Sequence, residues 1–239
     1  MDEAVVHPCR TPGLGAWDQI GCYCERALNP AFWAEPLNAL SNLAFIFAAL
    51  MAYADYRATR PERGDPVIVF LILWTMVIGV GSFLFHTYAT LWARVADVVP
   101  IGVFIFAFVL VAYRWFVGLN WLLALGVAVL VTAATFTMPP WFNGSALYAP
   151  ALLMLIVTGV LLKARGHGAA NWIFAAAAVF VISLTFRTID RSELVCGMHL
   201  VGTHWAWHTL NAVVLYLLLR SLIEDPPAAP RAERASAAA

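Results

Sequence analysis

Charged residues are scarce in this chain. Lys, Arg, Asp and Glu make up 12% of its 239 residues, whereas a soluble domain of this size carries roughly twice that share. Hydrophobic residues make up 62% of the chain, and they gather in apolar runs of about 20 residues, the length that spans a bilayer as a helix. This composition excludes a soluble enzyme held by a single anchor and predicts a polytopic membrane protein.

The chain also lacks an excess of positive charge, and it has almost no lysine. Its 14 basic and 14 acidic residues give a net charge of zero, which offers nothing for binding nucleic acid. The only lysine, Lys163, ends the fifth apolar run, and a retinal protein is excluded because its Schiff base needs a lysine in the last helix. The high share of arginine suggests a GC-rich bacterial genome, so we expect the protein in a bacterial inner membrane.

Seven apolar segments are expected to form the fold. They should all be helices because lipid offers no hydrogen-bond partner to bare backbone groups, so the predicted fold class is an all-α membrane protein with seven transmembrane helices. An N-terminal segment, 1–36, precedes the helical domain, 37–222, and a disordered tail, 223–239, follows it. The segments lie near residues 37–56, 66–87, 97–115, 120–137, 145–163, 170–187 and 203–222.

The positive charges predict the orientation of the helices. Nine of the 14 basic residues fall in the first, third and fifth loops and at the C-terminal end, and the other five fall in the N-terminal segment and the even-numbered loops. Positive charge accumulates on the cytoplasmic side of a membrane protein. We therefore expect the N-terminal segment outside and the C-terminal tail in the cytoplasm.

Polar residues interrupt the apolar segments at one depth. In this topology Ser82 and His86 lie near the outer end of the second helix, and Asp97 lies at the outer start of the third. His204 and His208 open the seventh helix, so all five residues meet in the outer third of the membrane. The two histidines are four positions apart and share a helix face, so both imidazoles can point at one ion.

This set of residues is typical of a catalytic zinc site. Three imidazoles leave a fourth position open for water, a carboxylate can orient that water, and a hydroxyl can donate to an oxygen that becomes negative in the transition state. Plain alternatives exist for each residue. Ser82 can bond a carbonyl of its own helix, a histidine can sit at the interface with its tip in water, and Asp97 can cap the third helix. These alternatives weaken together, because intramembrane ionisable residues are costly and usually functional.

Three blocks of sequence resemble the alkaline ceramidases, seven-helix intramembrane hydrolases related to the adiponectin and progestin receptors. Residues 23–45 are similar to the family's W-C-E segment followed by A-E-x-x-N-x-x-S-N. Residues 81–100 are similar to its G-S-x-x-F-H, with an Asp eleven positions after the His and then a Pro. Residues 204–219 are similar to its H-x-x-x-H in the last helix, and the likeness extends over residues 22–222.

The resemblance implies a zinc ion held by His86, His204 and His208. It also implies a zinc-bound water hydrogen-bonded to Asp97, with Ser82 alongside. Such a zinc lowers the pKa of its water to about 7 and polarises a carbonyl, and the carboxylate moves the proton from the water to the leaving amine.

The resemblance further implies a hydrolase of linear amides that cleaves ceramide into sphingosine and a fatty acid. The expected partner is therefore a membrane lipid, either ceramide or a related N-acyl lipid, since many bacteria lack sphingolipids. Trp207 is expected to line the substrate pocket, whereas Trp205 is expected to belong to an interfacial aromatic belt.

A calcium site near the start of the first helix is also implied by the resemblance. Glu25 and Glu35 match two of the family's ligands, but Cys22 and Ala27 stand where the family has Asp and Asn. Calcium prefers six to eight oxygens, so two carboxylates with backbone and water would hold it weakly. The alternative is that Glu25 pairs with Arg26 or another outer arginine.

All four cysteines fall on the outer side of the predicted topology. That compartment permits disulfides, and Cys9, Cys22, Cys24 and Cys196 allow three pairings. The resemblance aligns Cys24 and Cys196 with a disulfide-bonded pair, which leaves Cys9 and Cys22 for each other. Free thiols are the alternative.

Two other functions compete with a zinc amidase. A serine hydrolase would use Ser82, His86 and Asp97 as a triad, but it places two members on one helix turn and leaves the other two histidines unexplained. A non-enzymatic seven-helix lipid sensor would contain a structural zinc and turn over no lipid amide.

Overall fold

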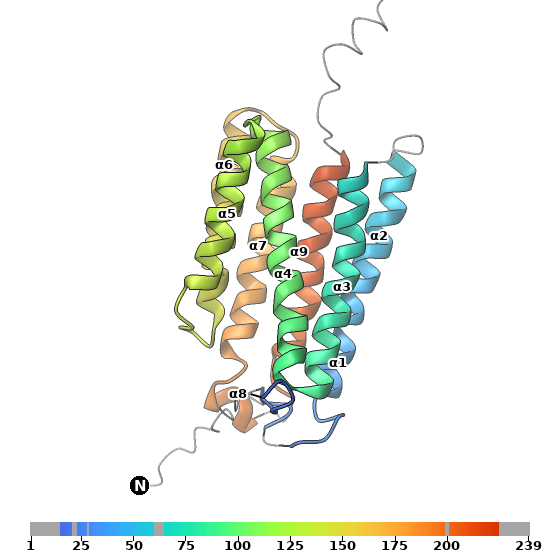
Figure 1. The fold of residues 1–239 in the computed structure, drawn as a ribbon, viewed down its shortest axis with the longest axis vertical. Helices are drawn as coiled ribbons and strands as arrows, with labels where there is room; N and C mark the ends of the chain where they lie inside the picture. Colours follow the sequence, from blue (N-terminus) through green and yellow to red (C-terminus); the bar gives the residue numbers. More distant parts are fainter. Residues whose placement is uncertain (1–14, 21–22, 28, 60–64, 199–200, 225–239) are drawn as a thin grey trace, which may run out of the picture.

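The chain folds into an elongated bundle of helices (Figure 1). A computed structural model describes residues 15–20, 23–27, 29–59, 65–198 and 201–224. These residues contain helices and no strands, so the predicted all-α class is confirmed. The expected Cys9–Cys22 pair and the tail beyond residue 224 lie outside the described residues.

Six helical segments are long and apolar enough to cross a membrane, and a seventh apolar helix, Trp121–Thr137, is shorter. The protein is therefore an integral membrane protein. The helices are α1 (Pro36–Ser41), α2 (Leu43–Thr59), α3 (Pro66–Tyr88), α4 (Leu91–Ala112), the π-helical turn η1 (Tyr113–Val117), α5 (Trp121–Thr137), the 3₁₀ turn η2 (Ser145–Tyr148), α6 (Ala149–Ala164), α7 (Ala170–Ile189), α8 (Glu193–Met198) and α9 (His204–Glu224).

The helices differ from the predicted ones in four main respects. The third apolar helix begins at Leu91, six residues before the predicted start at residue 97, because Arg94 is accommodated within its first turns. The first apolar span is divided into α1 and α2 at Asn42. The short helix α8 was not predicted, and α9 continues two residues into the expected tail.

The last helix lies at the centre of the bundle. It packs against α7, α2, α1 and α3, while α4 packs between α3 and α5. In α9, 61% of the apolar window is buried, against 28–44% in the other five spans. A helix buried on most of its faces holds its side chains in fixed positions, which suits it to carry a site.

Helices α3 and α4 approach each other closely at Gly81. Pro100 has no N–H, so the carbonyl of Ala96 loses its usual helical donor. An added Cβ at Gly81 would collide with that carbonyl oxygen, so only a glycine lets the two backbones meet here. The contact brings the next residue on each helix together, and Ser82 interacts with the carboxyl of Asp97.

We expect Gly81→Ala to push α3 and α4 apart at Ala96. The free energy of unfolding should fall by about 1–3 kcal/mol, the usual cost of overpacking, as measured by thermal unfolding in detergent. Gly126→Ala is the matched control, because no atom lies within 4 Å of its added Cβ and alanine favours a helix. Equal unfolding temperatures for the two variants would contradict the close contact.

Candidate metal centre

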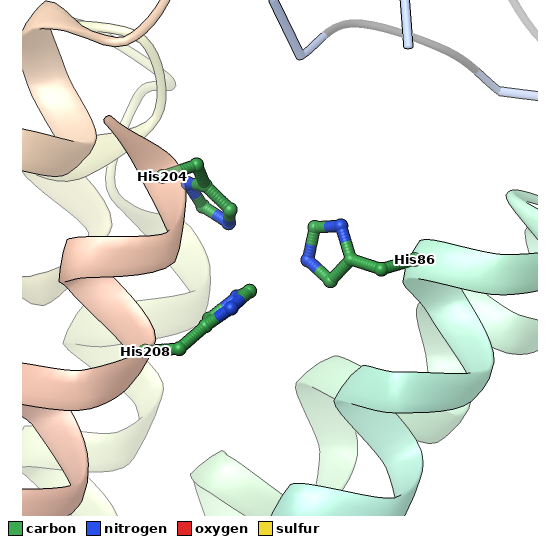
Figure 2. Close-up of side chains that lie close together, drawn as sticks. All are labelled: His86, His204 and His208. Carbon is green, nitrogen blue, oxygen red and sulfur yellow. The ribbon is translucent and has the colours of Figure 1, made fainter. Parts of the chain in front are cut away.

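Three buried imidazoles face one another at the end of the bundle that carries α8 (Figures 1 and 2). His86 lies in the last turn of α3, and His204 and His208 lie in the first two turns of α9. One ring nitrogen from each residue lies within 4.8 Å of the other two, and the side chains are 1–2% exposed. Among the residues that the structure describes, this is the only cluster of three or more His, Cys, Asp or Glu that can hold a metal ion.

Hydrogen bonds outside the cluster orient two of the rings. Nδ1 of His86 lies 2.6 Å from Oε2 of Glu35. Nδ1 of His208 lies 2.8 Å from Oγ of Ser41 and 3.0 Å from the carbonyl oxygen of Asn38. A carboxylate or carbonyl that accepts from one ring nitrogen sets the tautomer and leaves the other nitrogen to bind a metal.

Two further ring nitrogens support a metal. Nε2 of His86 and Nδ1 of His204 are buried and have no hydrogen-bond partner. A buried polar atom without a partner is costly, and a bound cation would remove that cost. Three neutral imidazoles with one position left open are the donor set of a catalytic zinc site, so the residues present fit zinc.

The two carboxylates assigned to calcium are both engaged within the protein. Glu25 accepts hydrogen bonds from the backbone N–H groups of Leu37 (2.7 Å) and Asn38 (2.8 Å) in the first turn of α1, where a negative charge is stabilising. Glu35 accepts from Nε of Arg26 at 2.5 Å and from the side-chain amide of Asn38 at 3.0 Å. These residues do not fit a calcium ion, and Arg26 pairs with Glu35 rather than with Glu25.

The neighbours of Glu35 favour its ionised form. Burial alone would raise its pKa, but the neighbouring His86 and Arg26 outweigh burial and hold the pKa of Glu35 below its usual value. An ionised carboxylate accepts strongly from the imidazole N–H of His86. Glu35 therefore acts on the metal centre through a ring nitrogen, not as a ligand.

Asp190 and a disulfide hold the start of α9 and the N-terminal segment together. Cys24 and Cys196 are joined, as the resemblance implied. Asp190, at the end of α7, accepts from the backbone N–H groups of Thr203 (2.6 Å) and His204 (2.8 Å). It also accepts from the backbone N–H of Cys24 at 3.4 Å. Asp190 could not be singled out from the sequence. An Asp that follows an apolar span is an ordinary interfacial residue, and its contact with the start of α9 is visible only in the fold.

A cavity of about 770 Å³ opens beside the three histidines. Ser82, Asp97 and Trp207 lie in its wall. Asp97 is in the second turn of α4, whose N-cap residue is Thr90, so the alternative that Asp97 caps the third helix is wrong. The ring of Tyr23, not singled out from the sequence, also lines the cavity.

A smaller apolar space of about 50 Å³ adjoins the cavity. Phe45 and Ile78 line both spaces, and Phe108 and Leu218 line only the deeper one. Leu218 lies ten residues beyond His208 on α9, which corresponds to about 15 Å along the helix axis. The site therefore has a polar part at the three histidines and an apolar extension toward the middle of the bundle.

The geometry does not form a serine triad. In a triad the histidine lies between the serine and the carboxylate. Here His86 is oriented by Glu35, while Asp97 interacts directly with Ser82. The cluster of three histidines accounts for all the imidazoles at the site, which a triad leaves unexplained.

The sequence model of one protein family, described as Ceramidase, matches residues 23–223. The matched range includes the three histidines and every other residue described at the site. No curated protein matches the chain.

The purified protein should contain about one zinc ion per chain, since three imidazoles and one open position bind a single zinc. The double variant His204→Ala/His208→Ala should lose it, as measured by elemental analysis after dialysis. The control is His167→Ala, which removes an imidazole that lies against Phe116 and outside the cluster, and it should keep its zinc. Full zinc retention in the double variant would show that the ion binds elsewhere.

Proposed function

The chain belongs to the ceramidase family, and from this premise we propose that it is an intramembrane zinc-dependent amidase. It would hydrolyse the amide bond of ceramide or of a related N-acyl lipid. The observation that carries the proposal is the buried cluster of three imidazoles beside a cavity that contains Asp97 and Ser82.

The polar residues of the cavity suit amide hydrolysis. A zinc ion held by the three histidines would polarise the amide carbonyl and lower the pKa of a bound water to about 7. The carboxylate of Asp97 accepts the proton of the attacking water and passes it to the leaving nitrogen. The hydroxyl of Ser82 donates to the carbonyl oxygen as that oxygen gains negative charge.

The shape of the cavity supports a lipid substrate. Its apolar extension suits an acyl chain, and its polar part lies near the ends of α3 and α9, where a headgroup meets the membrane boundary. With the N-terminal segment outside, as its lower share of positive charge predicts, the enzyme would act in the outer leaflet of a bacterial inner membrane.

A non-enzymatic sensor with a structural zinc is the alternative. Structural zinc sites are closed by four protein ligands, whereas catalytic sites keep a position open. In the described part of the chain three ligands cluster, and two of them, His204 and His208, line a large cavity whose wall contains a carboxylate. These features favour the amidase.

Asp97→Asn should keep its zinc and lose activity. The variant keeps the size of the side chain but removes the base, so the rate of lipid-amide hydrolysis should fall by about 10²–10⁴-fold. Ser82→Ala should also keep zinc and lose about 10²-fold, the value of one oxyanion donor. His86→Ala should lose both zinc and activity. Zinc content and the amine released from a panel of N-acyl lipids, identified by mass spectrometry, measure these effects.

Two results would change the mechanism. Loss of zinc in Asp97→Asn would make Asp97 a metal ligand. Full activity in the same variant would place the base elsewhere. If the zinc-loaded wild type released no amine from any lipid of the panel, the amidase itself would be refuted and the sensor favoured.

The charges in the cavity point to the headgroup of the substrate. Arg94, Arg187 and Arg191 line the cavity, against one acidic residue, Asp97. Arg187 and Arg191 bond to Asn143, but Nε of Arg187 is buried without a partner. Guanidinium groups match carboxylates and phosphates in shape and charge. We therefore propose that the preferred substrate carries an anionic group near the scissile amide, as in an N-acyl amino acid.

A matched pair of substrates tests this preference. N-palmitoylglycine and N-palmitoylethanolamine differ only in a carboxylate that replaces a hydroxymethyl group. The wild type should have the higher kcat/KM for the glycine conjugate, and Arg94→Gln should reduce the ratio by about tenfold, the value of one hydrogen bond to a charged group. Arg114→Gln, beyond the far end of α4, is the control and should leave the ratio unchanged. Equal kcat/KM values in the wild type would contradict an anionic headgroup.

A further inference from the structure

The guanidinium of Arg26 is enclosed by oxygen atoms. Arg26 is 2% exposed, and its five N–H groups meet five acceptors from two separate parts of the chain, residues 29–35 and 86–87. Nε donates to Oε1 of Glu35 (2.5 Å), Nη1 donates to the carbonyl oxygens of Asn29 (3.2 Å) and Ala31 (3.0 Å), and Nη2 donates to those of His86 (3.0 Å) and Thr87 (3.1 Å).

The donor atoms around Arg26 are those of a hard-cation site. One carboxylate and four backbone carbonyls, completed by water, are the kind of oxygen set that calcium takes. We infer that Arg26 is a built-in cation that fills such a site, so that this chain holds its metal centre together without calcium. This gives a physical reason why Glu25 and Glu35 do not fit a calcium ion. The positive charge that calcium would supply is already present in the side chain of Arg26.

Arg26 acts on the metal centre through Glu35. Its guanidinium holds Oε1 of that carboxylate, and Oε2 lies 2.6 Å from Nδ1 of His86. It also bonds the backbone at His86 and Thr87, so it fixes both the ring and the main chain of one metal ligand. Arg26 is therefore a positioning residue, and it joins the N-terminal segment to the end of α3.

An ordinary buried ion pair would not fix both the ring and the main chain of His86. A salt bridge needs only the contact between Arg26 and Glu35, whereas four of the five bonds go to main-chain carbonyls. Removal of the side chain would leave those four oxygens and the carboxylate around one space without a cation. The distinguishing consequence is that a divalent cation of the right size can replace the arginine.

The first measurement uses the wild-type protein purified in calcium-depleted buffer. Elemental analysis should find zinc and no calcium. Addition of millimolar calcium should change neither the unfolding temperature nor the zinc affinity, which is measured by competition with a chromophoric chelator. One bound calcium per chain, or an unfolding temperature raised by calcium, would overturn the inference.

The second measurement opens the site with Arg26→Ala. Without the guanidinium, Glu35 no longer holds His86 in place, and zinc affinity should fall by about 10–100-fold, the usual effect of losing such a partner. Millimolar calcium should restore zinc affinity and the unfolding temperature, whereas magnesium should not, since it requires a smaller octahedral site. A folded Arg26→Ala whose zinc affinity calcium does not restore would contradict the inference.

Two further variants complete the design. Arg26→Lys keeps a cation in the site with three donors instead of five. Its zinc affinity should therefore lie between those of the wild type and Arg26→Ala, and it should not respond to calcium. Arg57→Ala removes an exposed arginine from α2 and controls for general effects of calcium. Arg26→Ala could fail to fold in calcium-free buffer. In that case, folding in the presence of calcium supports the inference, and failure to fold with and without calcium overturns it. None of these measurements uses turnover, so they are independent of the amidase proposal.

Discussion

The site depends on the buried carboxylate of Glu35, which Arg26 and His86 share and which also accepts from the side-chain amide of Asn38. One oxygen is bonded to Arg26 and the other faces His86, while all three side chains are almost fully buried. A carboxylate in such surroundings is tolerated only when it is paired and hydrogen-bonded. The pairing therefore fixes the positions of three elements at once: the N-terminal segment, the start of α1 and the end of α3. The orientation of the His86 ring follows from it, and so does the direction of the nitrogen left for a metal.

The other site residues are placed by irregularities of the backbone. Asp97 lies next to Ala96, whose carbonyl meets Gly81 because Pro100 removes its usual donor. His204 begins its helix where Asp190 accepts the first backbone N–H groups, so its ring is fixed from the first turn. In a lipid core every backbone group needs a partner inside the protein. The two irregularities therefore position reactive side chains, Asp97 next to the contact at Gly81 and His204 next to Asp190.

The helices and five polar site residues could be predicted from the sequence because both signals are local. Apolar runs identify the spans, and pairs four residues apart place Ser82 with His86 on one helix face. The start of α4 could not be predicted, since Arg94 is accommodated by a cavity that only the folded bundle contains. The role of Arg26 was equally hidden, because four of its five partners are main-chain carbonyls that any residue could supply. A sequence pattern reports side chains, so sites built from backbone oxygens leave little trace in it.

A built-in cation changes how the N-terminal segment is attached to the centre. A dissociable ion would leave that attachment dependent on the concentration of the ion, whereas Arg26 is present in every copy of the chain. Three consecutive residues carry the attachment: Cys24 through the disulfide, Glu25 through the first turn of α1, and Arg26 through the end of α3. The residue before them, Tyr23, has its ring 3.9 Å from that of His204, and burial raises its pKa and keeps its hydroxyl protonated. Because the segment is held at three successive positions, this ring is a fixed part of the cavity wall beside His204.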